Sequence, residues 1–392
     1  MVTARRVVRT RTFNVSPNLT RTREYQLRKA WSDRDSCFFF ALADTEPDSW
    51  GRHVIARARA AARRDDPTLG PRRELDDLCA VDDHRRLGAL RRRDANARFL
   101  ASAESGHATT PPLVDLGRVL SATRAVELSQ ESASDLACLL GKATSLGGMR
   151  PKTTVLDTDG TLALGKFPSV GDERSITRGE VLALTLAATA DIDAARSRIE
   201  MAEGSPVAII TRFDRSAGGG RIPYISGATL LQAERSDSPT YTELVDALRS
   251  VSAEYRTDAV ALWRRLLFNL LVTNVDDHLH NIGLLHVGHG QWRLAPAFDL
   301  NPFPDTVRES KTMLSEDTGA ITSVQMLLDV APRFELTTSM ARRVLAEVVG
   351  AVARWREVAL SAEVGLTKAE LAAFADAFEH AEMEAARRVL AG

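Results

Sequence analysis

The 392-residue sequence contains only three cysteines, and it has no long apolar run. Cys37, Cys79 and Cys138 lie far apart and form none of the short spacings of metal sites, which argues against a disulfide framework and indicates a reducing compartment. A membrane helix needs about 18 consecutive apolar residues, and no segment reaches that length. The first 30 residues are basic, but no apolar segment follows them as it does in a secretory signal. We therefore expect a cytoplasmic protein that makes no membrane contact.

The chain also lacks an excess of either charge, because 51 Lys and Arg residues are balanced by 52 Asp and Glu residues. This balance makes the chain as a whole a poor candidate for nucleic-acid binding, which needs a basic surface. A local cluster at Arg85, Arg86 and 91–93 is interpreted as a solvated face, with an acidic partner or nucleic acid as the alternative. Lysine is scarce, so each lysine position is informative. The six lysines are Lys29, Lys142, Lys152, Lys166, Lys311 and Lys368.

The composition, 44% hydrophobic and 26% charged, is typical of a globular protein of two or three domains. We divide the chain into an N-terminal subdomain (1–112), a strand-rich lobe (113–227) and a helical lobe (228–392). Residues 101–112 are the best linker candidate because they are rich in Ser, Thr and Pro. Apolar periodicity predicts helices at 131–140, 179–190 and 258–272, and two or three more over 336–391.

A glycine-rich loop precedes two of the lysines, and residues 144–152 read Thr-Ser-Leu-Gly-Gly-Met-Arg-Pro-Lys. Asp159-Gly160 between two β-prone runs predicts a hairpin with a two-residue turn, which pairs Thr153 with Lys166 and places Lys166 beside Lys152. Adjacent glycines let backbone N–H groups approach phosphate oxygens, and ammonium groups neutralise their charge. The segment is therefore a candidate phosphate site, although it is not a Walker A loop. The alternative is an ordinary turn before a hairpin, with Lys166 exposed at a sheet edge.

The densest polar cluster, Asp-Asp-His-Leu-His-Asn at 276–281, directly follows the predicted apolar helix. A hairpin with its turn at 288–290 separates Asn281 from Asp299. Antiparallel pairing brings the two ends of a hairpin together, so Asn281 and Asp299 can bind one hard cation such as Mg²⁺ through oxygen. Asp276 is then free to act as a base toward a hydroxyl. Asp, four residues and Asn is the spacing of the protein-kinase catalytic loop, so the pattern favours phosphoryl transfer.

Two other interpretations of this cluster compete with phosphoryl transfer. Taken alone, Asp276 and Asp277 are equally typical of polar residues that end a helix. Half of the eight histidines lie close together here, which raises zinc as an alternative. These are His278, His280, His286 and His289. Their spacing matches no closed or catalytic zinc pattern, and no cysteine lies near them.

In their order and spacing, these motifs resemble the HipA-like serine/threonine kinases of bacterial toxin–antitoxin systems. The resemblance covers residues 38–384. The segments that carry it are 39–54 (FFALADTEPDSWGRHV), 145–152 (SLGGMRPK), 164–169 (LGKFPS), 212–215 (RFDR), 225–231 (ISGATLL), 274–281 (NVDDHLHN) and 294–299 (LAPAFD). A single motif such as RFDR would not be specific, whereas the whole set is.

The resemblance implies an α+β, two-lobed, protein-kinase-like fold that is related in shape to phosphatidylinositol kinases. It would have an N-terminal subdomain, a mainly helical C-terminal lobe, and ATP with Mg²⁺ between the lobes. Asp276 would be the catalytic base, Lys166 a phosphate contact, and Asn281 and Asp299 the Mg²⁺ ligands. The other implied nucleotide contacts are the phosphate loop (Ser145, Gly147, Gly148, Met149, Arg150, Lys152), the adenine hinge (Thr211, Arg212, Phe213), and His278 and Phe298. The family often has Tyr at the position of Phe298.

The resemblance further implies a growth-inhibiting toxin that phosphorylates Ser or Thr in a translation component such as an aminoacyl-tRNA synthetase. A HipB-like helix-turn-helix antitoxin would be its partner and would provide the only, indirect, link to DNA. Ser145 would be autophosphorylated, and its added charge of about −1.5 to −2 would repel the triphosphate. The alternatives are a small-molecule kinase with the same ATP site and a non-catalytic DNA-regulatory subunit. A DNA-binding module, however, has no reason to assemble Asp276, Asn281 and Asp299.

Overall fold

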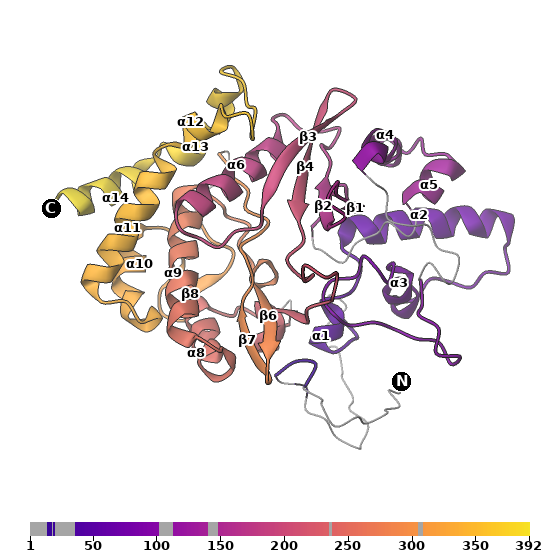
Figure 1. The fold of residues 1–392 in the computed structure, drawn as a ribbon, viewed down its shortest axis with the longest axis horizontal. Coiled ribbons are helices and arrows are strands. Elements are labelled where there is room, and N and C mark those ends of the chain that lie inside the picture. Colours follow the sequence, from indigo (N-terminus) through magenta and orange to yellow (C-terminus); the bar gives the residue numbers. More distant parts are fainter. Residues whose placement is uncertain are drawn as a thin grey trace.

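The structure is a computed structural model that describes residues 14–17, 19, 36–101, 113–139, 148–234, 237–304 and 309–392. The predicted linker lies outside these ranges except for its first residue, and so do Ser145 and Gly147. Within the described part, helices gather at the two ends of the molecule and the strands form three antiparallel sheets (Figure 1), as expected for the α+β class. No helix in that part is long and apolar enough to cross a membrane.

Short helices form the N-terminal end of the described chain. They are α1 (Phe40–Ala43), α2 (Ser49–Asp65), α3 (Glu74–Ala80), the 3₁₀ turn η2 (Leu113–Asp115), α4 (Leu116–Glu127) and α5 (Ala133–Leu139). Helix α2 begins after Asp48, whose side chain accepts a hydrogen bond of 2.6 Å from the Gly51 N–H and so satisfies one free donor of the first turn. Its apolar residues Trp50 and Val54 belong to a core shared with α4, α5 and the neighbouring sheet.

The arginine cluster of this end is divided, because the side chains of Arg85 and Arg86 are completely buried whereas Arg91 and Arg93 are exposed. Arg86 donates hydrogen bonds to the carbonyls of Leu78 (3.1 Å) and Val81 (2.7 Å). These carbonyls lie at the C-terminal end of α3, where helix carbonyls have no partner within the helix, and the guanidinium group supplies the donors that they need. Both interpretations from the sequence, a solvated face and a nucleic-acid contact, are therefore wrong for Arg85 and Arg86.

A four-stranded sheet follows, with strand order β1-β2-β4-β3. Its strands are β1 (Lys152–Leu156), β2 (Leu162–Lys166), β3 (Ser197–Ala202) and β4 (Ser205–Thr211). Alternate residues face opposite sides of a strand, and both sides are buried here. Ala163 and Ile209 face the core with α4 and α5, whereas Leu164 and Ile210 face the larger core that contains α6 (Ile176–Thr189).

The register of the first hairpin differs by one residue from the prediction. Lys152 lies opposite Lys166, and Thr153 lies opposite Gly165. The turn has three residues, because the Asp157 N–H donates to the Thr161 carbonyl at 2.8 Å and Gly160 adopts φ +81°. Three-residue hairpin loops commonly place glycine in this left-handed conformation. The correction brings the two lysines directly opposite each other, on the same face of the sheet.

The second lobe is mainly helical and contains the other two sheets. The strands are β5 (Tyr224–Ser226), β6 (Gly283–Gly288) and β7 (Gln291–Leu294), which pair in that order, and β8 (Met313–Ser315), which pairs with β9 (Gly319–Ala320). The helices are α7 (Gly227–Leu231), α8 (Tyr241–Val251), α9 (Tyr255–Leu271), α10 (Val324–Val330), α11 (Thr338–Val352), α12 (Trp355–Ala359), α13 (Ala375–Phe378) and α14 (Ala381–Ala391). The 3₁₀ turns are η3 (Leu279–Asn281), η4 (Ala331–Phe334) and η5 (Glu370–Phe374).

Helix α9 is the centre of this lobe, and its Leu262, Trp263, Leu266 and Leu267 are fully buried. It packs against α8, α10, α11 and α14 (Figure 1). The helices predicted at 131–140, 179–190 and 258–272 are confirmed as α5, α6 and α9, with ends that differ by up to three residues. Four α-helices, α11 to α14, replace the two or three that were predicted over 336–391.

Candidate active site

A cleft of about 660 Å³ lies between the sheet β1–β4 and the second lobe. One wall comes from β2, α6 and β4, and includes Leu164, Lys166 and Glu180. The opposite wall comes from the chain around η3 and from Phe298 and Asp299, which follow β7. The cleft therefore collects most of the side chains that the sequence singled out, and it also contains side chains that the sequence did not.

Lys166 lies at the centre of the cleft and binds two carboxylates. Its Nζ is 2.6 Å from Glu180 Oε1 and 2.7 Å from Asp299 Oδ1. Burial alone would lower the pKa of this ammonium, but Asp299 and Glu180 outweigh it and raise that pKa above its usual value. Burial would likewise raise the pKa of Asp299, yet Lys166 and Lys152 hold it well below its usual range. Lys166 is thus a buried cation, and the interpretation as an exposed edge lysine is wrong.

Glu180 was not identified from the sequence. It is the only acidic residue in α6, and the residues that follow it, Val181 and Leu182, are fully buried. A carboxylate is rarely buried unless it is paired, so an isolated Glu in an apolar helix was the available signal. The neighbouring Gly179 allows α6 to pack closely, because a Cβ there would lie 2.8 Å from the Phe374 ring.

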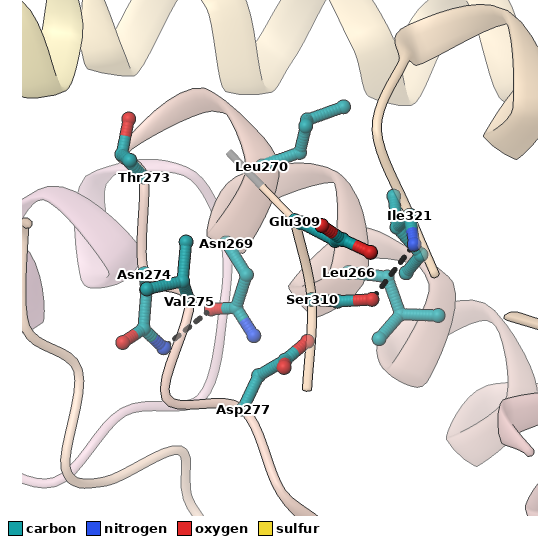
Figure 2. A pocket seen from close by; sticks show the side chains of 10 residues that line it. All are labelled: Leu266, Asn269, Leu270, Thr273, Asn274, Val275, Asp277, Glu309, Ser310 and Ile321. Atoms are coloured by element: carbon teal, nitrogen blue, oxygen red, sulfur yellow. Dashed lines mark hydrogen bonds between the residues drawn. The ribbon is translucent and has the colours of Figure 1, made fainter. Parts of the chain in front are cut away.

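The loop after α9 is held in place by two asparagines. Thr273 takes the left-handed conformation at φ +53°, and the Asn274 N–H returns to the Asn269 carbonyl at 2.8 Å. The Asn274 side chain donates to Asn269 Oδ1 at 3.2 Å and accepts from the Asn301 N–H at 3.1 Å. Figure 2 shows the first of these side-chain contacts in the small pocket behind the loop. The start of the 276–281 cluster is thereby anchored to both α9 and the chain after Asp299.

Asp276 and Asn281 lie at the two ends of this cluster and contact each other. Asn281 Nδ2 donates to the Asp276 carbonyl at 2.9 Å, and the Asn281 N–H donates to the His278 carbonyl at 2.8 Å. Because its nitrogen is used in this way, Asn281 has Oδ1 available for a cation. The Asp276 carboxylate is partly exposed, and its Oδ1 accepts from Lys311 Nζ at 2.5 Å.

Asp277 points the other way, into the protein. Its Oδ2 accepts from the Tyr241 hydroxyl at 2.8 Å, and its Oδ1 accepts from the Lys311 backbone N–H at 2.8 Å. Burial raises the pKa of Asp277 to about 6, although these hydrogen bonds oppose the shift. The two adjacent aspartates therefore have separate environments, so the interpretation of both as helix-terminal polar residues does not hold.

The hinge end of the cleft is aromatic. The rings of Phe213 and Phe298 lie with centroids 5.4 Å apart, and Tyr224 lies 6.4 Å from Phe213. Thr211 also lines the cleft. The Arg212 guanidinium is occupied elsewhere, because it binds Asp214 at 2.6 Å and donates to buried carbonyls of the N-terminal subdomain. Only the backbone of Arg212 is therefore suited to a hinge contact.

The described residues of the phosphate loop differ in whether they lie in the cleft, in the protein interior or on the surface. Gly148 lines the cleft with φ +94°, and a Cβ there would lie 2.5 Å from Lys152 Nζ. Lys152 is buried, with its Nζ 3.8 Å from Asp48 Oδ2. Arg150 binds Asp172 at 2.6 and 2.8 Å, and Met149 is 82% exposed. Gly148 therefore lines the cleft with Lys152 buried next to it, whereas Met149 is exposed and Arg150 is paired with Asp172.

The oxygen atoms of the cleft suit the Mg²⁺ ion that accompanies a nucleotide. Asp299 is ionised and Asn281 offers an amide oxygen, which are the oxygen ligands that Mg²⁺ prefers. His278 lines the cleft, and its buried Nδ1 has no hydrogen-bond partner within the described residues. Nowhere in the ranges that the structure describes do three His, Cys, Asp or Glu side chains gather as a metal centre.

Comparison with known proteins connects this site to a family. Residues 144–356, more than half of the chain, match the family described as HipA-like C-terminal domain. The chain belongs to the HipA-like C-terminal domain family. It is 30% identical over 179 residues to "Putative kinase Y4mE" of Sinorhizobium fredii. That match covers 41% of this chain and 42% of the relative, so the chain aligns with less than half of that protein's length.

Two solved structures resemble this chain. The HipA of Shewanella oneidensis MR-1, solved as a toxin–antitoxin complex with HipB and operator DNA, matches with a TM-score of 0.60 at 15% identity. The match covers 90% of this chain and 87% of that one. The Helicobacter pylori proinflammatory kinase CtkA covers 62% of this chain and 91% of its own, with a TM-score of 0.47 at 13% identity. The expected α+β, two-lobed, kinase-like fold is thus confirmed by the HipA match.

Proposed function

We propose that this protein is a kinase that transfers the γ-phosphoryl group of ATP, with Mg²⁺, to a Ser or Thr hydroxyl of a protein. The observation that carries the proposal is the cation Lys166, held between Glu180 and Asp299 in a cleft that also contains Asn281. Kinases use a lysine–glutamate pair to place the phosphates, and an Asp and an Asn to hold the metal. A binding module has no use for this combination.

The proposed roles follow from the positions in the cleft. Phe213 and Phe298, whose rings contact each other, would form an apolar surface for the adenine ring, with the backbone of residues 211–213 as the hinge. Asn281 and Asp299 would hold Mg²⁺, which supplies charge neutralisation at the phosphate oxygens when it is bound. Lys166 would contact the phosphates. Asp276 would take the proton of the acceptor hydroxyl, because its carboxylate is partly exposed and has no position in the nucleotide cleft wall.

The phosphate loop completes the proposal. Gly148 and Lys152 would contact the triphosphate directly, and Arg150 would have to leave Asp172 to do so. Ser145, Gly147 and Met149 are proposed as part of the same loop on the basis of the sequence. Ser145 is proposed as an inactivating autophosphorylation site, since a phosphate there would compete for the donors that serve ATP.

The biological setting is proposed from the family. The Shewanella oneidensis HipA is described in a complex with HipB and operator DNA. By analogy, we infer that this chain has a HipB-like antitoxin partner, contacts DNA only through it, and acts in the cytoplasm on a protein such as an aminoacyl-tRNA synthetase. The buried Arg85 and Arg86 are unavailable for direct DNA contact, which weakens the case for a DNA-regulatory subunit.

Labelled ATP added to a cell lysate tests the proposal. Purified protein with [γ-³²P]ATP and Mg²⁺ should label protein bands, and chelation of Mg²⁺ should abolish the label. The matched control is the Asp299→Asn variant, which should transfer nothing. Label that appears only in small molecules would replace the protein substrate with a metabolite. No transfer by the wild-type protein, with or without the antitoxin partner, would contradict the kinase activity itself.

A further inference from the structure

Lys311 contacts the proposed catalytic base, and none of the roles above uses it. Its Nζ lies 2.5 Å from Asp276 Oδ1, and the same oxygen lies 3.7 Å from His278 Nε2. Lys311 lines the cleft on the side of the second lobe. It is separated from Asp276 by 35 positions in the sequence, so the contact depends on the tertiary fold.

This ion pair has little value for stability. The Lys311 and Asp276 side chains are 59% and 39% exposed. Exposed pairs of this kind contribute about 0–1 kcal/mol, because water screens them and two long side chains must be ordered. A structural purpose therefore does not account for the contact.

The backbone around Lys311 is nevertheless held firmly against the catalytic loop. The Lys311 N–H donates to Asp277 Oδ1 at 2.8 Å, and Thr312 Oγ1 donates to the Asp277 carbonyl at 3.0 Å. Tyr241 holds the same carboxylate from the other side. On the far side, Ser310 Oγ accepts from the Ile321 N–H at 2.7 Å (Figure 2). Asp277 thus fixes the backbone of Lys311, and this position allows the Lys311 side chain to reach Asp276.

We propose that Lys311 is a positioning residue for phosphoryl transfer, which orients the Asp276 carboxylate toward the acceptor hydroxyl. The inference rests on the proposed function, in which Asp276 is the base. A carboxylate has two equivalent oxygens and rotates easily. With Oδ1 held by Lys311, Oδ2 is the oxygen that faces the acceptor. A base that is oriented by a third group recurs in enzymes, and its supporting contacts set the rate.

The chemical step balances without a change at Lys311. The acceptor oxygen forms the new bond to the γ-phosphorus while its proton moves to Asp276 Oδ2. The bond from the γ-phosphorus to the bridging oxygen breaks, and ADP keeps that electron pair. Lys311 remains an ammonium and keeps its hydrogen bond to Oδ1 throughout, so its effect on the reaction passes through Asp276.

Four variants test this role in the full-length protein, by single-turnover transfer from labelled ATP. Lys311→Met keeps the length of the side chain and removes its charge, and it should lower the transfer rate about 10- to 100-fold, as loss of an outer supporting contact does. The Kd for ATP with Mg²⁺ should stay unchanged. Lys311→Arg should recover most of the rate. The matched control Lys368→Met, at an exposed lysine, should behave as the wild type.

The fourth variant is the double mutant Lys311→Met/Asp276→Asn, which separates positioning from a direct effect. If Lys311 acts through Asp276, the double mutant should be no slower than Asp276→Asn alone, within about two-fold. If Lys311→Met lowers the transfer rate equally in the wild type and in Asp276→Asn, Lys311 acts elsewhere. If Lys311→Met transfers faster than the wild type, Lys311 blocks the base. An active Lys311→Met overturns only this inference, whereas an inactive wild-type protein overturns the proposed function and this inference with it.

Discussion

Glu180 in α6 and Lys166 in β2 form a buried ion pair, with Glu180 Oε1 2.6 Å from Lys166 Nζ. The same ammonium lies 2.7 Å from Asp299, the residue that we assign to the metal. One cation therefore joins the helix, the sheet and the proposed metal site. Because the two carboxylates share this cation, a change in either one alters what the other binds.

Glu180→Gln should lower kcat/KM for ATP about 10- to 100-fold, the usual cost of losing a partner that orients a ligand-binding group. Without the second carboxylate, Lys166 is drawn to Asp299 alone, which leaves that oxygen less available to the metal. Steady-state kinetics over a range of Mg²⁺ concentrations would measure the effect, and extra Mg²⁺ should restore part of the rate. Glu173→Gln, an exposed residue just before α6, makes the same charge change and should have no effect. Wild-type kinetics in Glu180→Gln would rule out the shared-cation arrangement.

Asp299→Asn should abolish transfer and should also destabilise the fold at neutral pH. Lys166 holds the pKa of Asp299 below its usual value, so its charge contributes stability above pH ~4 that is lost as the pH falls below that value. The difference in unfolding free energy from the wild type, on the order of 2 kcal/mol, should stay constant from pH 5 to 8 and shrink at lower pH. Urea unfolding at several pH values measures it, with exposed Asp317→Asn as the control. A difference in unfolding free energy that appears only at high pH would contradict the ion pair between Asp299 and Lys166.

Asp276→Asn should lower the transfer rate by about 10²–10⁴, the usual contribution of a general base. ATP binding should persist, because Asp276 contacts Lys311 and the loop and does not contact Lys166 or Asp299 in this structure. Titration with a fluorescent ATP analogue, followed by single-turnover transfer, separates the two effects. A large loss of nucleotide affinity would mean that Asp276 holds the metal and that the roles of Asp276 and Asp299 are exchanged.

The site residues whose proximity could be predicted are those that a short stretch of chain connects. Asp276, Asn281 and Asp299 are joined by one turn and one hairpin, so the spacing along the chain already implies that they lie near each other. Lys166 binds Asp299 across 133 positions, and Lys311 binds Asp276 across 35. Contacts of this length depend on how the lobes pack, and no local pattern encodes them. The scarcity of lysine marked both positions as informative but gave no partner for either.

Burial and turn length explain the predictions from sequence that were wrong. Adjacent arginines have the same pattern whether water or backbone carbonyls receive their hydrogen bonds. Both Arg85 and Arg86 are buried, and the Arg86 guanidinium donates to the carbonyls of Leu78 and Val81. The hairpin register also differed by one residue, because Asp159 and Gly160 fit both a two-residue and a three-residue turn. Helix α6 was predicted correctly, yet the importance of its one carboxylate depends on Lys166, which another strand supplies.

The raised pKa of Asp277 makes stability depend on pH in a direction opposite to that for Asp299. The pKa of Asp277, about 6, lies above the value of about 3.9 in the unfolded chain. The protonated Asp277 side chain therefore contributes fully to the free energy of unfolding below pH ~4, and this contribution is lost as the pH rises through 6. Asp277→Asn removes this dependence. Relative to the wild type, the variant should therefore gain unfolding free energy between pH 4 and 6, in total about 3 kcal/mol at 1.36 kcal/mol per unit, and the gain should level off above pH 7. Urea midpoints at pH 4.5, 5.5, 6.5 and 7.5 would record this trend, and Asp317→Asn should show none. A difference that is constant over this range would show that Asp277 is already ionised at pH 4.5, and burial would then not control its charge.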